Sequence, residues 1–165
     1  MSKHENIVFL DYDGVVNTMM WNADGTKCDY NFASDGKVNN FQACQWVSEF
    51  CQKKGYSIVV TSTWRRDPMF MILLKQGGLR DGIRIYGGVP CLEGKSRADE
   101  IVHWLNEHPF VKNYIIFDDE DCHYTESEYP LSEHLVLCDT TTGFTYNSYI
   151  DACEIHDSGK TRKEW

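Results

Sequence analysis

The chain has 165 residues, of which 42% are hydrophobic and 25% charged, and its net charge is −9 with a pI near 5.0. This composition excludes a collagen, a coiled coil and a wholly disordered chain, and the acidic charge argues against a long binding track for duplex nucleic acid. The length suits one domain that folds without disulfides or a structural metal. We therefore expect a single domain over residues 1–165, with a frayed polar tail at 157–165.

The cysteines and the start of the chain indicate a reducing, cytoplasmic environment. The seven cysteines are odd in number, form no C-x-x-C pair, and have no histidine cluster beside them. Several lie in apolar segments, as Cys138 does, and we interpret them as buried thiols. The first apolar run, at 7–10, is too short for a signal peptide or a membrane span. We expect a cytoplasmic protein without a membrane partner.

Short apolar runs alternate with amphipathic segments along the chain. In order, the patterns predict a strand at 7–10, a long loop at 17–37, a helix at 38–54, a strand at 57–60, a helix at 67–76, a strand at 83–86, a helix at 98–105, strands at 114–117 and 134–138, and a helix at 147–153. Strands that alternate with helices in this way predict an α/β fold with an open parallel sheet wound right-handed.

Acids or hydroxyls directly follow three of these strands, and the side chains concerned are Asp11 and Asp13, Thr61 and Ser62, and Asp118 and Asp119. The carboxyl ends of parallel strands meet at one edge of a sheet, where α/β proteins bind their ligands. Carboxylates brought together there repel one another, and a hard cation with oxygen ligands relieves the repulsion. The pattern therefore predicts a Mg²⁺ site at this edge.

Acids, a hydroxyl and a lysine around Mg²⁺ form a set of groups suited to phosphoryl transfer. An aspartate can attack phosphorus, while the metal and a lysine neutralise charge on the transferring group. A second acid can protonate the leaving oxygen and then activate water. Asp11 and Asp13 fit this division of roles, because Gly14 allows the chain to turn after the strand.

Four segments in order resemble the motifs of the haloacid dehalogenase-like (HAD) phosphatase superfamily. They are Phe9-Leu10-Asp11-Tyr12-Asp13-Gly14-Val15, Val59-Val60-Thr61-Ser62, Gly94-Lys95-Ser96 and Ile115-Ile116-Phe117-Asp118-Asp119. Residues 61–65 and 135–145 look most like the HAD domain of RNA-repair proteins. The pair of acids in the fourth motif is similar to that in the phosphatase domain of phage polynucleotide kinases.

The resemblance implies a three-layer Rossmann-like core and a role for each acid. Asp11 would be the nucleophile and a Mg²⁺ ligand. Asp13 would be the general acid and base, with its backbone carbonyl on the metal. Asp118 would bind Mg²⁺ directly, and Asp119 would bind it directly or through water.

The resemblance also implies how the phosphate is held. Thr61 would hydrogen-bond the phosphoryl oxygens, and Lys95 would pair with both the phosphate and Asp11. Ser62 and Arg65 are weaker candidates for contacts to the phosphate or the rest of the substrate. Trp64 is expected in the core, with a base-stacking role as the alternative.

The spacing of the motifs leaves no room for a separate cap domain, so the site is expected to be open. An open site admits large substrates, or is closed by a loop or by an oligomer. The RNA-repair likeness suggests a phosphate on a nucleotide or on an oligonucleotide end as the substrate. A terminal nucleotide held by Arg65, Arg66 and an aromatic side chain would reconcile this substrate with the acidic net charge.

Other interpretations explain fewer of the residues. Phosphorylatable receiver modules use similar groups, but their adjacent acidic pair follows the first strand and their phosphorylated aspartate comes later in the chain. Here the order is reversed, because Asp11-x-Asp13 comes first and the adjacent pair Asp118-Asp119 comes last. A P-loop is excluded because Val89 stands where its first glycine is required. A catalytically idle HAD-fold binding protein stays open, although nothing in the motifs is damaged. Release of inorganic phosphate would distinguish a phosphatase from both the receiver and the idle domain.

Overall fold

The computed structural model describes residues 5–18 and 38–159. Its elements, in chain order, are β1 (Glu5–Leu10), β2 (Asn17–Thr18), β3 (Val38–Asn39), α1 (Phe41–Lys54), β4 (Tyr56–Val60), the 3-10 helix η1 (Thr63–Arg66), α2 (Phe70–Gln76), β5 (Ile85–Gly88), α3 (Arg97–Glu107), β6 (Val111–Asp118), the 3-10 helix η2 (Leu131–His134), β7 (Leu135–Leu137) and α4 (Tyr146–Asp157). Strands and helices alternate for most of this order, as the α/β prediction requires.

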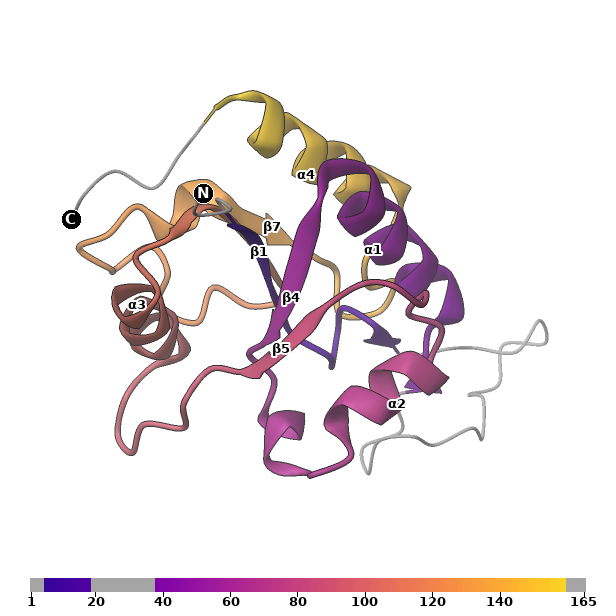
Figure 1. Ribbon diagram of the computed structural model, residues 1–165, viewed down its shortest axis with the longest axis horizontal. Coiled ribbons are helices and arrows are strands. Elements are labelled where there is room, and N and C mark those ends of the chain that lie inside the picture. Colours follow the sequence, from indigo (N-terminus) through magenta and orange to yellow (C-terminus); the bar gives the residue numbers. More distant parts are fainter. Residues whose placement is uncertain (1–4, 19–37, 160–165) are drawn as a thin grey trace.

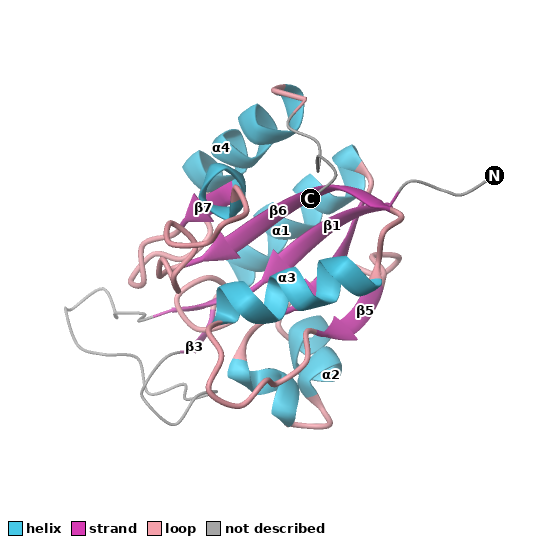
Figure 2. Cartoon of the chain, turned by 90° about the vertical axis from the view of Figure 1, so that its left-hand side faces the viewer, coloured by secondary structure: helices cyan, strands magenta, loops and turns pink. Residues whose placement is uncertain are grey.

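Five parallel strands form an open sheet in the order β5-β4-β1-β6-β7. Helices α1 and α4 pack side by side against one face of this sheet, and α3 covers the other (Figures 1 and 2). This arrangement is the predicted three-layer, Rossmann-like core. The described residues include no separate cap domain, and no helix among them is long and apolar enough to cross a membrane.

Alternation along β1 explains why the strand is apolar on both sides. Val8 and Leu10 pack into the core beneath α1 and α4, whereas Ile7 and Phe9 pack into the core beneath α3. All four side chains are fully buried. A central parallel strand has helices on both faces, so it shows a continuous apolar run and no polar alternation.

Several boundaries differ from the sequence-based prediction. The helix expected at 38–54 begins at Phe41, because the Asn40 side chain caps it by accepting the Ala43 N–H, and the two residues before the cap pair with β2. The helix expected at 67–76 begins later, as α2 at Phe70–Gln76, and the 3-10 helix η1 precedes the predicted range. The edge strand expected at 83–86 lies at Ile85–Gly88.

The other differences lie in the second half of the chain. Strand β6 begins three residues before the predicted 114–117, and the strand predicted at 134–138 covers only Leu135–Leu137. Helix α4 ends at Asp157, so the first residue of the tail predicted to fray at 157–165 is the last residue of this helix. The rest of the predicted loop at 17–37 and the end of the tail at 160–165 lie outside the described residues. Cys51 and Cys138 are free and buried, as predicted, whereas Cys91 is exposed and Cys122 and Cys153 are only partly buried.

Candidate active site

The register of the three central strands brings the predicted site residues to one level. Leu10 lies beside Val60 on one neighbouring strand and beside Phe117 on the other. The next residue in each chain segment is Asp11, Thr61 or Asp118. Backbone hydrogen bonds continue the ladder, because the Thr61 N–H donates to Leu10 and the Asp11 N–H donates to Phe117.

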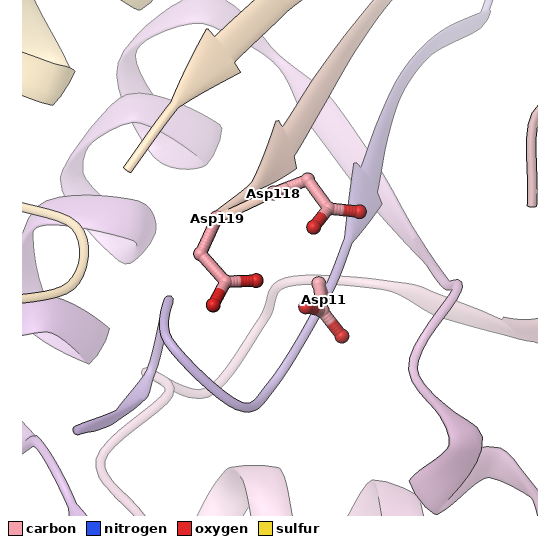
Figure 3. Close-up of side chains that lie close together, drawn as sticks. All are labelled: Asp11, Asp118 and Asp119. Carbon is pink, nitrogen blue, oxygen red and sulfur yellow. The ribbon is translucent and has the colours of Figure 1, made fainter. Parts of the chain in front are cut away.

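Three carboxylates converge at this edge. Asp11 from the end of β1 and Asp118 and Asp119 from the end of β6 point toward one another (Figure 3). One carboxylate oxygen from each lies within 4.8 Å of the others. Asp11 and Asp118 are buried, and Asp119 is partly exposed. The Asp13 carboxylate, which was predicted to act beside them, is not part of this cluster.

Arg97 is the cation that contacts the cluster. Its Nη1 lies 2.9 Å from Asp118 Oδ2 and 3.4 Å from Asp11 Oδ2. Lys95, for which the resemblance implied a contact with Asp11, is exposed and forms no ion pair among those of the described residues. Ser96 caps α3 in a reciprocal capping box with Asp99, so Arg97 is the first helical residue and Lys95 lies in the turn before the cap.

The electrostatics of the cluster favour a divalent cation. Burial, and then the negative charge of Asp118, raise the pKa of Asp11 well above its ordinary value, although Arg97 opposes this. Burial also raises the pKa of Asp119. Three ionised carboxylates and one guanidinium would leave a net charge of −2, which one Mg²⁺ neutralises through the oxygen ligands that it prefers. The residues therefore fit the metal that was predicted, with Asp11, Asp118 and Asp119 as the ligands on offer.

Thr61 supplies an unpaired hydroxyl beside these acids. Its Oγ1 is fully buried and has no hydrogen-bond partner among the described residues. A buried hydroxyl without a partner costs free energy, so its retention points to a ligand that it binds. Ser62 differs, because its Oγ accepts the Trp64 N–H and caps η1. Of these two predicted phosphate-binding hydroxyls, only Thr61 is unoccupied.

A tight turn after β6 holds Asp118 in place. Cys122 and His123 have positive φ angles of 45° and 67°, which non-glycine residues seldom adopt. The turn brings the buried Tyr124 back, so that its hydroxyl donates to Asp118 Oδ2 over 2.9 Å. The Cys122 thiol lies 3.7 Å from the same oxygen, and burial raises the pKa of this thiol to about 12. Asp118 is thus fixed by neutral donors as well as by Arg97.

Asp119 is held between the first motif and the loop after β7. Its Oδ2 accepts a hydrogen bond of 2.9 Å from the Thr140 hydroxyl. On its other side lies Gly14, where a Cβ atom would come within 2.1 Å of that same oxygen. Gly14 also has a φ of +81°, so both its conformation and its lack of a side chain are needed here.

Asp13 lies on the turn after β1, and two side chains donate to it. Trp64 Nε1 is 3.2 Å from Asp13 Oδ2, and Asn17 Nδ2 is 3.3 Å from Asp13 Oδ1. The predicted core position of Trp64 is half right, because the partly buried ring packs against the core while its N–H faces the site.

Arg65 anchors the turn that carries Thr61, and its guanidinium is fully engaged. Nη1 donates to the carbonyl oxygens of Thr61 and Ser62, Nε donates to that of Val89, and Nη2 forms an ion pair of 2.8 Å with Glu100. The Arg65 and Glu100 side chains are only 6% and 10% exposed. These partners occupy the donors of the Arg65 guanidinium, and its contact with the substrate stays a prediction.

A cleft of about 470 Å³ adjoins the acidic cluster. Arg97 belongs to both, and the remaining residues that line the cleft are Thr63, Arg65, Arg66, Cys91, Leu92, Glu93, Gly94, Lys95 and Glu100. Arg66, Lys95 and the oppositely charged Glu93 are exposed and form no ion pair among the described residues, whereas Arg65 and Glu100 neutralise each other, so with Arg97 the basic side chains outnumber the acidic ones. The cleft is therefore a locally cationic surface on an acidic chain.

Some site residues gave little signal in the sequence. Tyr124 and Thr140 lie in irregular segments and reach the acids only through the folded chain. Arg97 was detectable in principle, because the Ser96-x-x-Asp99 pattern predicts where α3 begins. That pattern would have placed Arg97, and not Lys95, at the first turn facing the sheet edge.

Comparison with known proteins agrees with the motifs. Residues 7–148 match the family described as the HAD domain in Swiss Army Knife RNA repair proteins, while no curated protein matches the sequence. The match runs from β1 to the first turn of α4 and contains every residue of the site described above. HAD domains imply phosphatase-type chemistry, here in a setting of RNA repair. The chain therefore belongs to the family of HAD domains found in Swiss Army Knife RNA repair proteins.

Proposed function

We propose that this protein is a Mg²⁺-dependent phosphomonoesterase that removes a phosphate from a nucleotide or a nucleic-acid end. The observation that carries the proposal is the position of the buried Asp11 carboxylate. It lies beside Arg97 and the pair Asp118 and Asp119. It follows β1, and the neighbouring strand β4 is followed by Thr61, whose hydroxyl has no partner among the described residues. A carboxylate, a hydroxyl donor and a guanidinium at one sheet edge suit a phosphoryl group that is attacked by the carboxylate.

In the first step an Asp11 carboxylate oxygen forms a bond to phosphorus as the bond between phosphorus and the leaving oxygen breaks. Asp13 gives its proton to that leaving oxygen. The Thr61 hydroxyl and Arg97 bind the non-bridging oxygens, on which negative charge gathers. Asp11, Asp118 and Asp119 would hold Mg²⁺, which would supply further positive charge at the transferring group when bound.

The second step hydrolyses the phosphoaspartate. Asp13, now ionised, takes a proton from water, and the water oxygen attacks phosphorus. The bond between phosphorus and the Asp11 oxygen breaks, which releases inorganic phosphate and restores both carboxyl groups to their starting states. The same pair of acids therefore serves both halves of the reaction, as proton balance requires.

The cleft beside the site supports a substrate with a further negative charge. Arg66 and Lys95 are exposed there, next to Arg97, and neither is paired among the described residues. Basic side chains of this kind bind phosphodiester oxygens without reading sequence. We infer that the terminal phosphate lies at Asp11 and the next phosphate of an oligonucleotide lies near Arg66 and Lys95.

The test is phosphate release from a mononucleotide, a 3′- or 5′-phosphorylated oligonucleotide, a sugar phosphate and an aryl phosphate. We expect release that requires Mg²⁺, stops with EDTA, and disappears in Asp11→Asn. A receiver-like module would be phosphorylated once without turnover, and an idle binding domain would release nothing. Either result, or turnover by Asp11→Asn at the wild-type rate, would refute the proposed mechanism.

A matched pair of variants tests the substrate inference. Lys95→Gln should raise KM for the oligonucleotide and leave KM for the aryl phosphate unchanged, because only the oligonucleotide extends into the cleft. Lys112→Gln removes another exposed lysine, on β6 and outside the cleft lining, and should change neither constant. Equal effects of the two variants would show that the cleft does not bind the substrate.

A further inference from the structure

Two donors from different elements hold the carboxylate of Asp13. The Trp64 indole N–H in η1 donates to Oδ2, and the Asn17 side-chain amide in β2 donates to Oδ1, over 3.2 Å and 3.3 Å. An indole N–H and an amide NH₂ can only donate, so both contacts match an acceptor oxygen. Each carboxylate oxygen of Asp13 thus has one fixed partner.

The two donors are themselves fixed by the fold. Asn17 is only 6% exposed, and its backbone closes the turn after β1 through hydrogen bonds with Tyr12 and Gly14. The backbone N–H of Trp64 donates to Ser62 Oγ, and the indole ring packs against the core. Arg65, the next residue, ties η1 to the end of β4. The Asp13 carboxylate is therefore positioned from both sides of the site.

We propose that Trp64 and Asn17 are positioning residues that aim the Asp13 carboxyl group for its two proton transfers. The proposal rests on the proposed role of Asp13 as general acid and base. A carboxylate oxygen has two lone pairs, and a fixed donor on each oxygen occupies one of them. The proton that Asp13 carries is thereby confined to the lone pairs directed away from Trp64 and Asn17.

This role predicts an effect that depends on the leaving group. An alkyl phosphate such as a nucleotide needs its leaving oxygen protonated, whereas a nitrophenyl phosphate has a leaving group that departs as the anion. Loss of one donor lets the carboxyl group rotate away from the leaving oxygen. Proton transfer then slows, while phosphate binding by Thr61 and Arg97 is unchanged.

The experiment compares Trp64→Phe with wild type in single-turnover phosphorylation of the full chain with Mg²⁺. We expect at least about a tenfold fall in rate for a mononucleotide, part of the 10²–10⁴-fold that general acid catalysis supplies. The rate with nitrophenyl phosphate should stay close to wild type, and so should the concentration of each substrate that gives half the maximal single-turnover rate. Trp46→Phe alters a tryptophan that packs on Tyr146 and Tyr149 and should affect neither substrate.

A double-mutant cycle isolates the coupling to Asp13. In an Asp13→Asn background, Trp64→Phe should cause no further loss, because the group it positions is already gone. Additive losses, or an equal fall with both substrates, would overturn the proposal. If Trp64→Phe fails to fold by circular dichroism, Asn17→Ser removes the other donor and should give the same split. A wild-type protein that releases no phosphate would refute the proposed function itself, whereas an active wild type with an unaffected Trp64→Phe refutes only this inference.

Discussion

Arg97 bridges two carboxylates of the site, Asp11 and Asp118, through a single nitrogen. Burial disfavours the charge of Arg97, but those two carboxylates raise its pKa, so the guanidinium stays protonated at every working pH. Its charge is thus available to the phosphoryl group throughout the reaction. At the scale of single residues, we consider this the contact that most affects turnover after the acids themselves.

We predict that Arg97→Met lowers kcat by about 10²–10³-fold, the usual loss when one charge-stabilising donor is removed from a transition state. Lys95→Met should leave kcat for an aryl phosphate nearly unchanged, because Lys95 does not contact Asp11. Steady-state kinetics with a small aryl phosphate decide between them. A larger loss in Lys95→Met than in Arg97→Met would return the catalytic contact to Lys95.

Gly14 gives a second test at this scale. Gly14→Ala places a methyl group where Asp119 Oδ2 now lies, so we expect the Mg²⁺ concentration for half-maximal activity to rise at least tenfold. Gly55→Ala is a matched control, because Gly55 has a similar φ of +73° but no atom within 4 Å of an added Cβ. Both variants carry backbone strain, and only Gly14→Ala should alter metal dependence. Identical metal titrations would show that the Asp119 contact has no role.

The positions of the acids were predictable from the sequence because Asp11 and Asp118 directly follow apolar runs and their partners Asp13 and Asp119 come one or two residues later. Their supporting side chains were not. Trp64 reaches Asp13 from 51 positions away, and Thr140 reaches Asp119 from 21 positions away. Such contacts depend on tertiary placement and have no local pattern. These contacts orient the acids. The acids themselves could therefore be predicted from the sequence, but the side chains that fix their orientation could not.

At the scale of elements, η1 and α3 are joined by the buried ion pair of Arg65 and Glu100. The Arg65 guanidinium donates hydrogen bonds to the carbonyl oxygens of Thr61 and Ser62, and the Glu100 carboxylate also accepts a hydrogen bond from the Leu92 N–H. The pair therefore fixes the loop with the buried Thr61 hydroxyl relative to the helix that carries Arg97. One buried pair sets the distance between two elements of the site.

Glu100→Gln keeps the shape and the acceptor for Leu92 but removes the charge opposite Arg65. We expect it to lower the free energy of unfolding by about 3–5 kcal/mol, the cost of leaving a buried charge without its partner. Glu49→Gln breaks an exposed pair with Arg80 and Lys53 and should change stability little. Urea unfolding followed by circular dichroism measures both, and equal effects would contradict a structural role for the buried pair.

The elements themselves were largely predicted, and the errors share one cause. The buried strands are continuous apolar runs, so they could be located from hydrophobicity alone. The segments that were misplaced lie at edges or turns, where short pairings such as that of β2 with β3 or a cap such as Asn40 decide the boundary. Such local hydrogen bonds are weak signals in a sequence, so element ends were displaced by a few residues.

At the scale of the whole molecule, repulsion between the ionised carboxylates of Asp11, Asp118 and Asp119 lowers the stability of the folded protein when no metal is bound. Because burial raises the pKa of Asp11 and Asp119, the folded protein keeps protons that the unfolded chain has lost. The contribution of these acids to metal-free stability is therefore greatest below about pH 4, the ordinary pKa of an aspartate, and is lost as pH rises toward their raised folded values. Bound Mg²⁺ should offset this loss by stabilising the ionised form.

We predict that, in EDTA, Asp11→Asn becomes more stable relative to wild type as the pH rises from 4 to 8. The measured quantity is the free energy of unfolding of the variant minus that of wild type, which should increase over this range. Asn cannot ionise, so the variant avoids the repulsion from Asp118. Chemical unfolding at several pH values measures this difference. Parallel pH profiles for the two proteins would mean that Asp11 carries no raised pKa in the folded state.

The central claim is that Asp11 is the group that receives the phosphate. The most direct measurement is acid quenching of the wild-type protein during turnover of a ³²P-labelled substrate, followed by borohydride reduction and peptide mass spectrometry. We predict ³²P on the acid-quenched protein before reduction, loss of that label on reduction as Asp11 is converted to homoserine, and no label in Asp11→Asn. Turnover with no acid-stable label, or label on another residue, would contradict the account.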